Sequence, residues 1–145
     1  MGLWEKADES GKPSAWFRIY QCGDAYYGQI VKKFAQNGEN PSAWRCTKCK
    51  GTQRNAPVLG LTFIKNMRRD GLQYQGGTIL DPRDGSVYNA VMRLSPDGQQ
   101  LTMRGYVLMP LLGQSETWHR IHDNQRDLPK PAACPARQGQ GQELI

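Results

Sequence analysis

The sequence predicts an all-β protein whose strands form an eight-stranded antiparallel up-and-down β-barrel. Apolar and polar residues alternate along most of the chain, which is the pattern of half-buried strands. Turn sequences interrupt this alternation about every ten residues, as they do in antiparallel sandwiches and barrels. The 145 residues include 16 Gly and 9 Pro, and no long segment has the periodicity of an amphipathic helix. Eight strands joined by short loops can close on themselves and remove the exposed sheet edges.

Strands are expected over eight segments, residues 2–6, 15–21, 25–34, 57–65, 72–80, 86–94, 100–109 and 115–122. Tight reversals are predicted at Asp81–Gly85 and Ser95–Gly98, where Pro fixes φ and Gly accepts a positive φ. The strands make one barrel domain over residues 1–122, and a domain of this length buries a core without help from a metal. Residues 123–145 form a tail rich in Pro, Gln and Gly, which we expect to be tied down through Cys134.

The more apolar face of each strand is assigned to the barrel interior. This face includes Tyr26, Ile30, Leu72, Thr78, Ala90, Leu94 and Leu101. An eight-stranded barrel is just wide enough to be filled by its own side chains or to hold one small ligand, and the sequence leaves both open. Met and aromatic side chains adapt to varied apolar ligands. The candidate walls of a ligand cavity are Phe17, Ile19, Tyr74, Tyr88, Met92, Met103, Val107 and Met109.

The net charge of +6 is concentrated in one part of the chain. From Lys32 to Arg69, nine basic residues stand against a single acid, Glu39. Such a segment attracts an anionic component of the cell envelope or an acidic ligand, and it serves equally as a solvated surface that maintains solubility. It lacks the interleaved aromatic residues of nucleic-acid stacking surfaces, so no nucleic-acid partner is expected. No apolar run reaches the ~20 residues that a membrane-spanning helix needs.

Two motifs lie at the ends of the predicted barrel. Gly2-Leu3-Trp4 opens the first strand, and Thr117-Trp118-His119-Arg120 closes the last. This pair resembles the lipocalin-like (calycin) superfamily, in which a Gly-x-Trp packs against an Arg of the final strand across the closed end of the barrel. An Arg guanidinium over an indole ring makes a cation–π contact. The resemblance implies that Trp4 and Arg120 close this barrel.

A longer series of motifs resembles the small secreted bacterial proteins grouped as domain of unknown function family 2147. The series consists, in chain order, of Gly28-Gln29-Ile30-Val31, Asn40-Pro41, Leu59-Gly60-Leu61, Gly76–Tyr88, Met103-Arg104-Gly105-Tyr106 and Thr117–Arg120. The resemblance extends over about residues 2–122. It implies a lipocalin-like barrel that is exported to the periplasm or secreted, with its signal peptide already removed. It implies no established activity.

The four cysteines are assigned by the ends of the barrel at which they lie. Connections in an up-and-down barrel alternate between the closed end, where the chain enters the first strand, and the opposite open end. Cys22 and the start of the tail therefore lie at the closed end, whereas Cys46 and Cys49 lie at the open end. An eight-residue strand rises about 27 Å, and a disulfide needs Cα atoms within about 7 Å. The predicted pairs are Cys22–Cys134 and Cys46–Cys49, and an even number of cysteines favours an oxidising compartment.

The motif Arg45-Cys46-Thr47-Lys48-Cys49-Lys50 is also compatible with a zinc site or a redox centre. A zinc site needs more ligands, and His119 and His122 are predicted at the other end on opposite faces, so no metal or cofactor is expected. Redox motifs of this spacing usually begin a helix, and none is evident here. The flanking cations could nevertheless lower the pKa of a thiol, so thiol–disulfide exchange at Cys46 and Cys49 stays a second alternative function.

The sequence carries no motif that indicates catalysis. It has no Gly-rich phosphate loop, nucleophile elbow or paired-His motif, and Asp81 and Asp84 are explained as turn residues. We therefore expect a protein that is not an enzyme and has no catalytic residues.

The leading hypothesis is that the barrel binds a small apolar or amphipathic ligand with an acidic head. The mouth would lie at the open end, and the predicted basic rim consists of Arg45, Lys48, Lys50 and Arg54. The first alternative is a filled barrel that binds an envelope polyanion or a partner protein through the Lys32–Arg69 surface. Binding through this surface should weaken as ionic strength rises, whereas binding of an apolar ligand inside the barrel should not.

Overall fold

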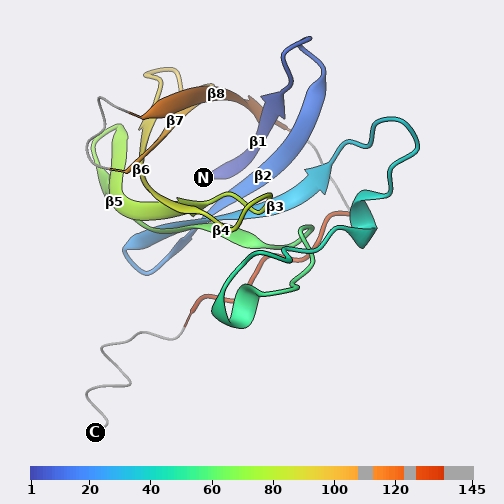
Figure 1. Ribbon diagram of the computed structural model, residues 1–145. Coiled ribbons are helices and arrows are strands. Elements are labelled where there is room, and N and C mark those ends of the chain that lie inside the picture. Colours follow the sequence, from blue (N-terminus) through green and yellow to red (C-terminus); the bar gives the residue numbers. More distant parts are fainter. Residues whose placement is uncertain (108–112, 123–126, 136–145) are drawn as a thin grey trace, which may run out of the picture.

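A computed structural model describes residues 1–107, 113–122 and 127–135 of the chain. Its eight strands form one closed antiparallel barrel in which each strand pairs with the next in sequence and the last pairs with the first (Figure 1). The predicted up-and-down barrel is therefore confirmed. The strands are β1 (Gly2–Ala7), β2 (Pro13–Cys22), β3 (Ala25–Lys33), β4 (Thr62–Asp70), β5 (Gln73–Leu80), β6 (Val87–Leu94), β7 (Gln100–Tyr106) and β8 (Gln114–Ile121).

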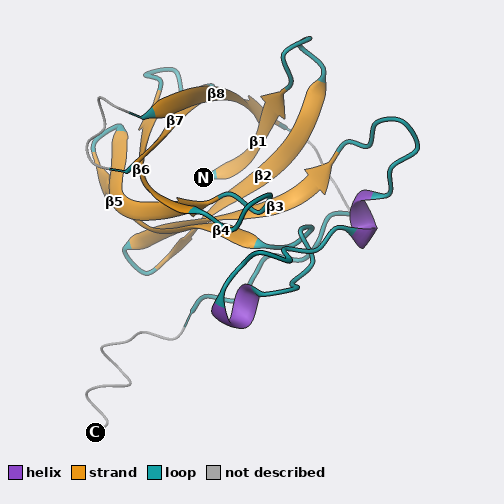
Figure 2. Cartoon of the chain, viewed as in Figure 1, coloured by secondary structure: helices purple, strands orange, loops and turns teal. Residues whose placement is uncertain are grey.

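Helical structure in the described residues is limited to two short 3₁₀ turns in the loop that joins β3 to β4. They are η1 (Pro41–Ala43) and η2 (Gly51–Gln53), and Figure 2 shows both outside the ring of strands. Within the described ranges, no helix is long and apolar enough to cross a membrane.

The fourth strand begins later than predicted, at Thr62 instead of residue 57. Val58 and Leu61 are each only 5% exposed, so their apolar character and spacing resemble those of a strand. They instead belong to the end of the β3–β4 loop, where Gly60 has a φ of 93°. Loop residues packed against a barrel wall need apolar side chains just as strand residues do, and the local sequence does not distinguish the two cases.

Two residues assigned to the interior lie elsewhere, Thr78 because β5 is irregular and Leu72 because it precedes the strand. The register of β5 against β6 shifts between Tyr74 and Gly77, and Gly76 has a φ of 82°. An extra residue in one strand reverses which later side chains face the core. Thr78 consequently stands opposite the exposed Asn89 on the outer face. Leu72 lies in the turn before β5 and is 40% exposed, so its interior assignment is also wrong.

Aromatic rings pack against one another in the barrel interior. The Phe17 ring centroid lies 4.7 Å from that of Phe63 and 4.5 Å from that of Trp118. Tyr26 and Tyr74 make an edge-to-face contact at 4.9 Å. All five side chains are buried, and tilted aromatic pairs of this kind add stabilisation beyond the area that they bury.

The tail is fastened along the outside of β2 and β3. A disulfide joins Cys22 to Cys134, with the Cα atoms 5.5 Å apart. Arg18 donates from Nη1 to the Pro129 carbonyl at 2.9 Å, and Gln29 donates from Nε2 to the Lys130 carbonyl at 3.1 Å. The Gln29 side chain is thereby covered, and the residue is only 2% exposed although it lies on a barrel wall.

Candidate functional site

One end of the barrel is closed by Trp4 and Arg120. The Arg120 guanidinium carbon lies 4.4 Å from the Trp4 ring centroid, and Arg120 donates hydrogen bonds to the carbonyls of Gly98 and Met1. A Cβ at Gly2 would lie 2.7 Å from Nη1 of Arg120, and the φ of 110° at this position also disfavours a side chain. The Gly-x-Trp motif and the Arg of the last strand thus form a single closure.

Charged side chains gather on the interior face at the open end. Lys6 and Lys33 both stand opposite Ala15, which is fully buried. Glu116 stands opposite the buried Met103. Cross-strand partners share a face of the sheet, so these three charged residues face the interior.

Two ion pairs satisfy most of the charge at this end. Nζ of Lys6 lies 3.0 Å from Oε2 of Glu116, and Oε1 of Glu116 accepts a hydrogen bond of 2.8 Å from the Trp118 indole. In the β5–β6 turn, Arg83 donates from Nε and Nη2 to the two carboxylate oxygens of Asp81. The hydrogen bonds from Arg83 hold the pKa of the Asp81 carboxyl below its ordinary value of 3.8.

Lys33 differs from its charged neighbours because it forms no ion pair within the described residues. In residues 1–107, 113–122 and 127–135, no carboxylate lies within ion-pair distance of its ammonium. Burial lowers the pKa of Lys33, and the cations Lys6 and Arg83 lower it further, against smaller opposite effects of Asp81 and Glu116. Among the described residues, this end therefore holds two paired cations, Lys6 and Arg83, and the half-buried Lys33, which forms no ion pair.

The predicted cavity residues divide into three groups. Phe17, Ile19, Tyr74, Met92 and Met103 are all buried, and Tyr88 is half-buried. Val107 is 69% exposed, so its assignment to the cavity wall is wrong. The reason is that β7 ends at Tyr106, and the alternation that would turn Val107 inward ends there as well. Met109 lies outside the described residues.

The predicted basic rim lies on the β3–β4 loop. Its members Arg45, Lys48, Lys50 and Arg54 are all exposed, and Figure 1 shows this loop beside β3 and β4, outside the ring of strands. None of the four is among the charged groups that act on Lys33.

The cysteines of this loop are joined by a disulfide and buried. Their Cα atoms are 5.3 Å apart, and Cys46 and Cys49 are 0% and 3% exposed. Sγ of Cys46 lies 3.6 Å from the Pro82 carbonyl, which brings the loop against the β5–β6 turn. No group of three or more potential metal ligands occurs in the part of the chain that the structure describes.

The alternation within the strands could have identified the charged residues of the open end. Trp4 is assigned to the interior by the closure motif, so Lys6, two residues later, faces the same way. Arg120 likewise implies that Trp118 and Glu116 face inward. Lys33 carries no such signal, because the register of β3 against β2 shifts between Trp16 and Phe17.

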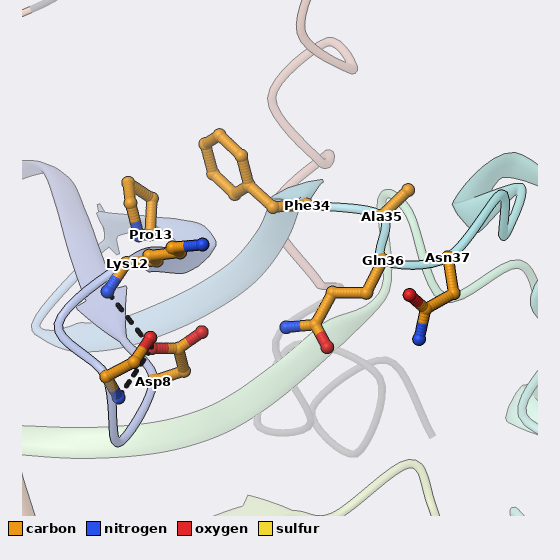
Figure 3. Close-up of a pocket in the computed structure, with 8 residues that line it drawn as sticks. Asp8, Lys12, Pro13, Phe34, Ala35, Gln36 and Asn37 are labelled. Atoms are coloured by element: carbon orange, nitrogen blue, oxygen red, sulfur yellow. Dashed lines mark hydrogen bonds between the residues drawn. The ribbon is translucent and has the colours of Figure 1, made fainter.

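Two pockets lie at the surface of the barrel. The larger, of about 610 Å³, lies between the β1–β2 loop and the residues that follow β3. Figure 3 shows its lining, in which the Asp8 carboxylate accepts hydrogen bonds from its own loop and the Phe34 ring forms an apolar wall. The smaller, of about 390 Å³, lies between the end of β3 and tail residues 127–129. Neither is lined by a predicted cavity residue.

Comparison with known proteins agrees with this architecture. No curated protein matches the sequence. Among solved structures, the barrel is similar to protein HP1028 from the human pathogen Helicobacter pylori, which is described as belonging to the lipocalin family. The TM-score is 0.70 with 18% identity, and the alignment covers 84% of this chain and 82% of that chain. The predicted lipocalin-like fold is therefore confirmed. A family model described as "uncharacterized protein conserved in bacteria" matches residues 2–120, and the chain thus belongs to this family, DUF2147.

Proposed function

We propose that the protein binds a small apolar or amphipathic ligand, with an acidic head, inside the barrel. The observation that carries the proposal is the contrast between the two ends. One end is closed by Trp4 and Arg120, and aromatic and Met side chains are buried in the interior. At the other end lies the half-buried cation Lys33, which forms no ion pair within the described residues. An apolar ligand tail would lie among the buried side chains, and its acidic head would remain at the open end.

The fold adds support of a general kind. Eight-stranded barrels of lipocalin type hold one small ligand in their interior, and the structural neighbour is described as a lipocalin-family protein. Fold similarity alone does not assign a function, so the proposal depends on the residues of the open end. The two disulfides support an exported protein that acts in the periplasm or outside the cell.

Native followed by denaturing mass spectrometry of the full chain, exported to a bacterial periplasm, tests the proposal. An additional mass that is present in the native spectrum and lost on denaturation would be the expected result and would identify the ligand. If the protein carries a bare mass, the same sample is titrated with a fluorescent apolar probe. Failure of the probe to bind with a 1:1 stoichiometry would overturn the proposal.

A second candidate is an anionic partner that binds the outer loop. The observation in its favour is that Arg45, Lys48, Lys50 and Arg54 are exposed and make no ion pair within the described residues. A polyanion such as heparin serves as the probe, and its affinity should fall steeply between low and physiological salt. An apolar ligand inside the barrel would not show this salt dependence. Burial of Cys46 and Cys49 argues against the third candidate, thiol–disulfide exchange, because attack on a disulfide requires access to its sulfur atoms.

A further inference from the structure

The unpaired lysine at the open end points to the chemical class of the ligand. Lys33 is the last residue of β3 and faces the interior opposite Ala15. Ala15 is small and fully buried. In the ranges that the structure describes, no carboxylate lies within ion-pair distance of the Lys33 ammonium.

The neighbouring charges are already engaged, which leaves Lys33 as the available group. Lys6 is paired with Glu116, whose second oxygen accepts the hydrogen bond from Trp118. Arg83 holds Asp81 through both carboxylate oxygens. A half-buried ammonium without a counterion is unfavourable, because it has lost part of its hydration and gained no partner. An anion placed next to Lys33 would remove this penalty.

The balance of charge at the opening favours a monoanion. The carboxylates of Asp81 and Glu116 act on Lys33 together with the cations Lys6 and Arg83, and Asp84 of the same turn also acts on Arg83. A doubly charged phosphate head would bring a second negative charge close to the same carboxylates and be repelled by them. A carboxylate supplies one charge and accepts strong charge-assisted hydrogen bonds from an ammonium.

We infer that Lys33 binds the carboxylate of a single-chain monocarboxylate whose hydrocarbon tail extends toward Phe17 and Trp118. This inference rests on the proposed function, since it assigns the class of ligand to the same barrel. It moves the acid-binding group from the exposed rim on the β3–β4 loop to the end of β3.

The test compares two ligands that differ only in the head group, dodecanoate and dodecanol. Both compete with a fluorescent apolar probe for the full-length, disulfide-bonded protein. The native protein should bind dodecanoate at least about tenfold more tightly than dodecanol, because hydrogen bonds to charged groups are the stronger class. Lys33→Gln should reduce the affinity for dodecanoate to that for dodecanol and leave the alcohol unaffected.

Two further variants make the result specific. Arg54→Gln removes an exposed cation of the outer loop and should keep the full preference for the acid. Lys33→Arg restores a cation at the site and should recover most of the preference. Urea unfolding of each variant shows whether its fold is intact.

The outcomes separate this inference from the proposed function. Equal binding of acid and alcohol by the native protein would overturn the role of Lys33 and leave the ligand-binding barrel in place. Retention of the acid preference in Lys33→Gln would do the same. Failure of both ligands to displace the probe, or failure of the probe itself to bind, would overturn the proposed function and this inference together.

Discussion

The two disulfides provide a test of how the tail stabilises the barrel. The Cys22–Cys134 bond joins residues 112 positions apart, whereas the Cys46–Cys49 bond joins residues 3 apart. Each pair is replaced by Ala, because a Ser hydroxyl at the buried Cys46 or Cys49 would add an unpaired polar group. The comparison then depends mainly on the length of chain that each bond closes.

The chain-entropy relation gives the expected magnitudes. Loss of the Cys22–Cys134 bond should lower the free energy of unfolding by about 4.8 kcal/mol at 25 °C. Loss of the Cys46–Cys49 bond should lower it by about 1.9 kcal/mol. The larger figure is a substantial part of the roughly 5–15 kcal/mol by which single domains are stable. Release of the tail would also expose Gln29 and remove its hydrogen bond to the Lys130 carbonyl, which adds to the first value. We therefore expect a difference of about 3 kcal/mol or more between the two variants.

Urea unfolding followed by tryptophan fluorescence measures both values, since Trp4 and Trp118 are buried in the folded protein. The slope of the transition should rise slightly in the variant without the long-range bond, because its unfolded chain is less compact. Equal losses in the two variants, or a larger loss for the Cys46–Cys49 pair, would refute the reasoning. Such a result would mean that local packing of the loop, and not the length of the closed segment, sets the contribution.

Three further predictions concern other parts of the barrel. Gly2→Ala should lower the free energy of unfolding by about 1–3 kcal/mol, because the new Cβ would press on Arg120. In the double variant with Arg120→Ala, part of the loss in urea midpoint should be recovered. Gln29→Leu should lower the free energy of unfolding by about 1–3 kcal/mol, because it leaves the Arg18 guanidinium without a side-chain acceptor. An unchanged urea midpoint would show that the hydrogen bond from Gln29 to the Lys130 carbonyl of the tail is dispensable. The lowered pKa of Asp81 means that its contribution is present above pH 3.8 and is lost as the pH falls below that value. Asp81→Asn should therefore lower the free energy of unfolding at neutral pH by less than about 1 kcal/mol. In this variant the free energy of unfolding should also fall less steeply toward pH 3, as measured by urea midpoints across that range.

The success and failure of sequence-based reasoning follow from how far apart the interacting residues lie. Turn sequences such as Asp81–Gly85 act within a few residues, and the strands on either side were located correctly. Val58 and Leu61 were misassigned to a strand because burial in a packed loop produces the same apolar pattern. Thr78 was misassigned because the irregularity near Gly76 reverses the alternation, and Val107 because its strand ends one residue earlier.

The candidate site was located only in part. Most of the apolar wall residues were identified from alternation and are buried. The basic residues were sought on the loop with the highest charge density, and that loop lies outside the ring of strands (Figure 1). Charge along the sequence does not reveal which cations share an opening, because Lys6, Lys33 and Glu116 come from three strands that are far apart in the chain.

The linear pattern thus suffices for the all-β class and the eight strands, and the resemblance of the terminal motifs to lipocalin-like proteins predicts the closure by Trp4 and Arg120. These features depend on alternation and turns within short segments, together with one pair of terminal motifs. The folded chain was needed to place Lys33 at the opening and the tail against Gln29, because both depend on register shifts and contacts between distant segments. A shift of one residue in a strand exchanges its inner and outer faces, and no local pattern records such a shift.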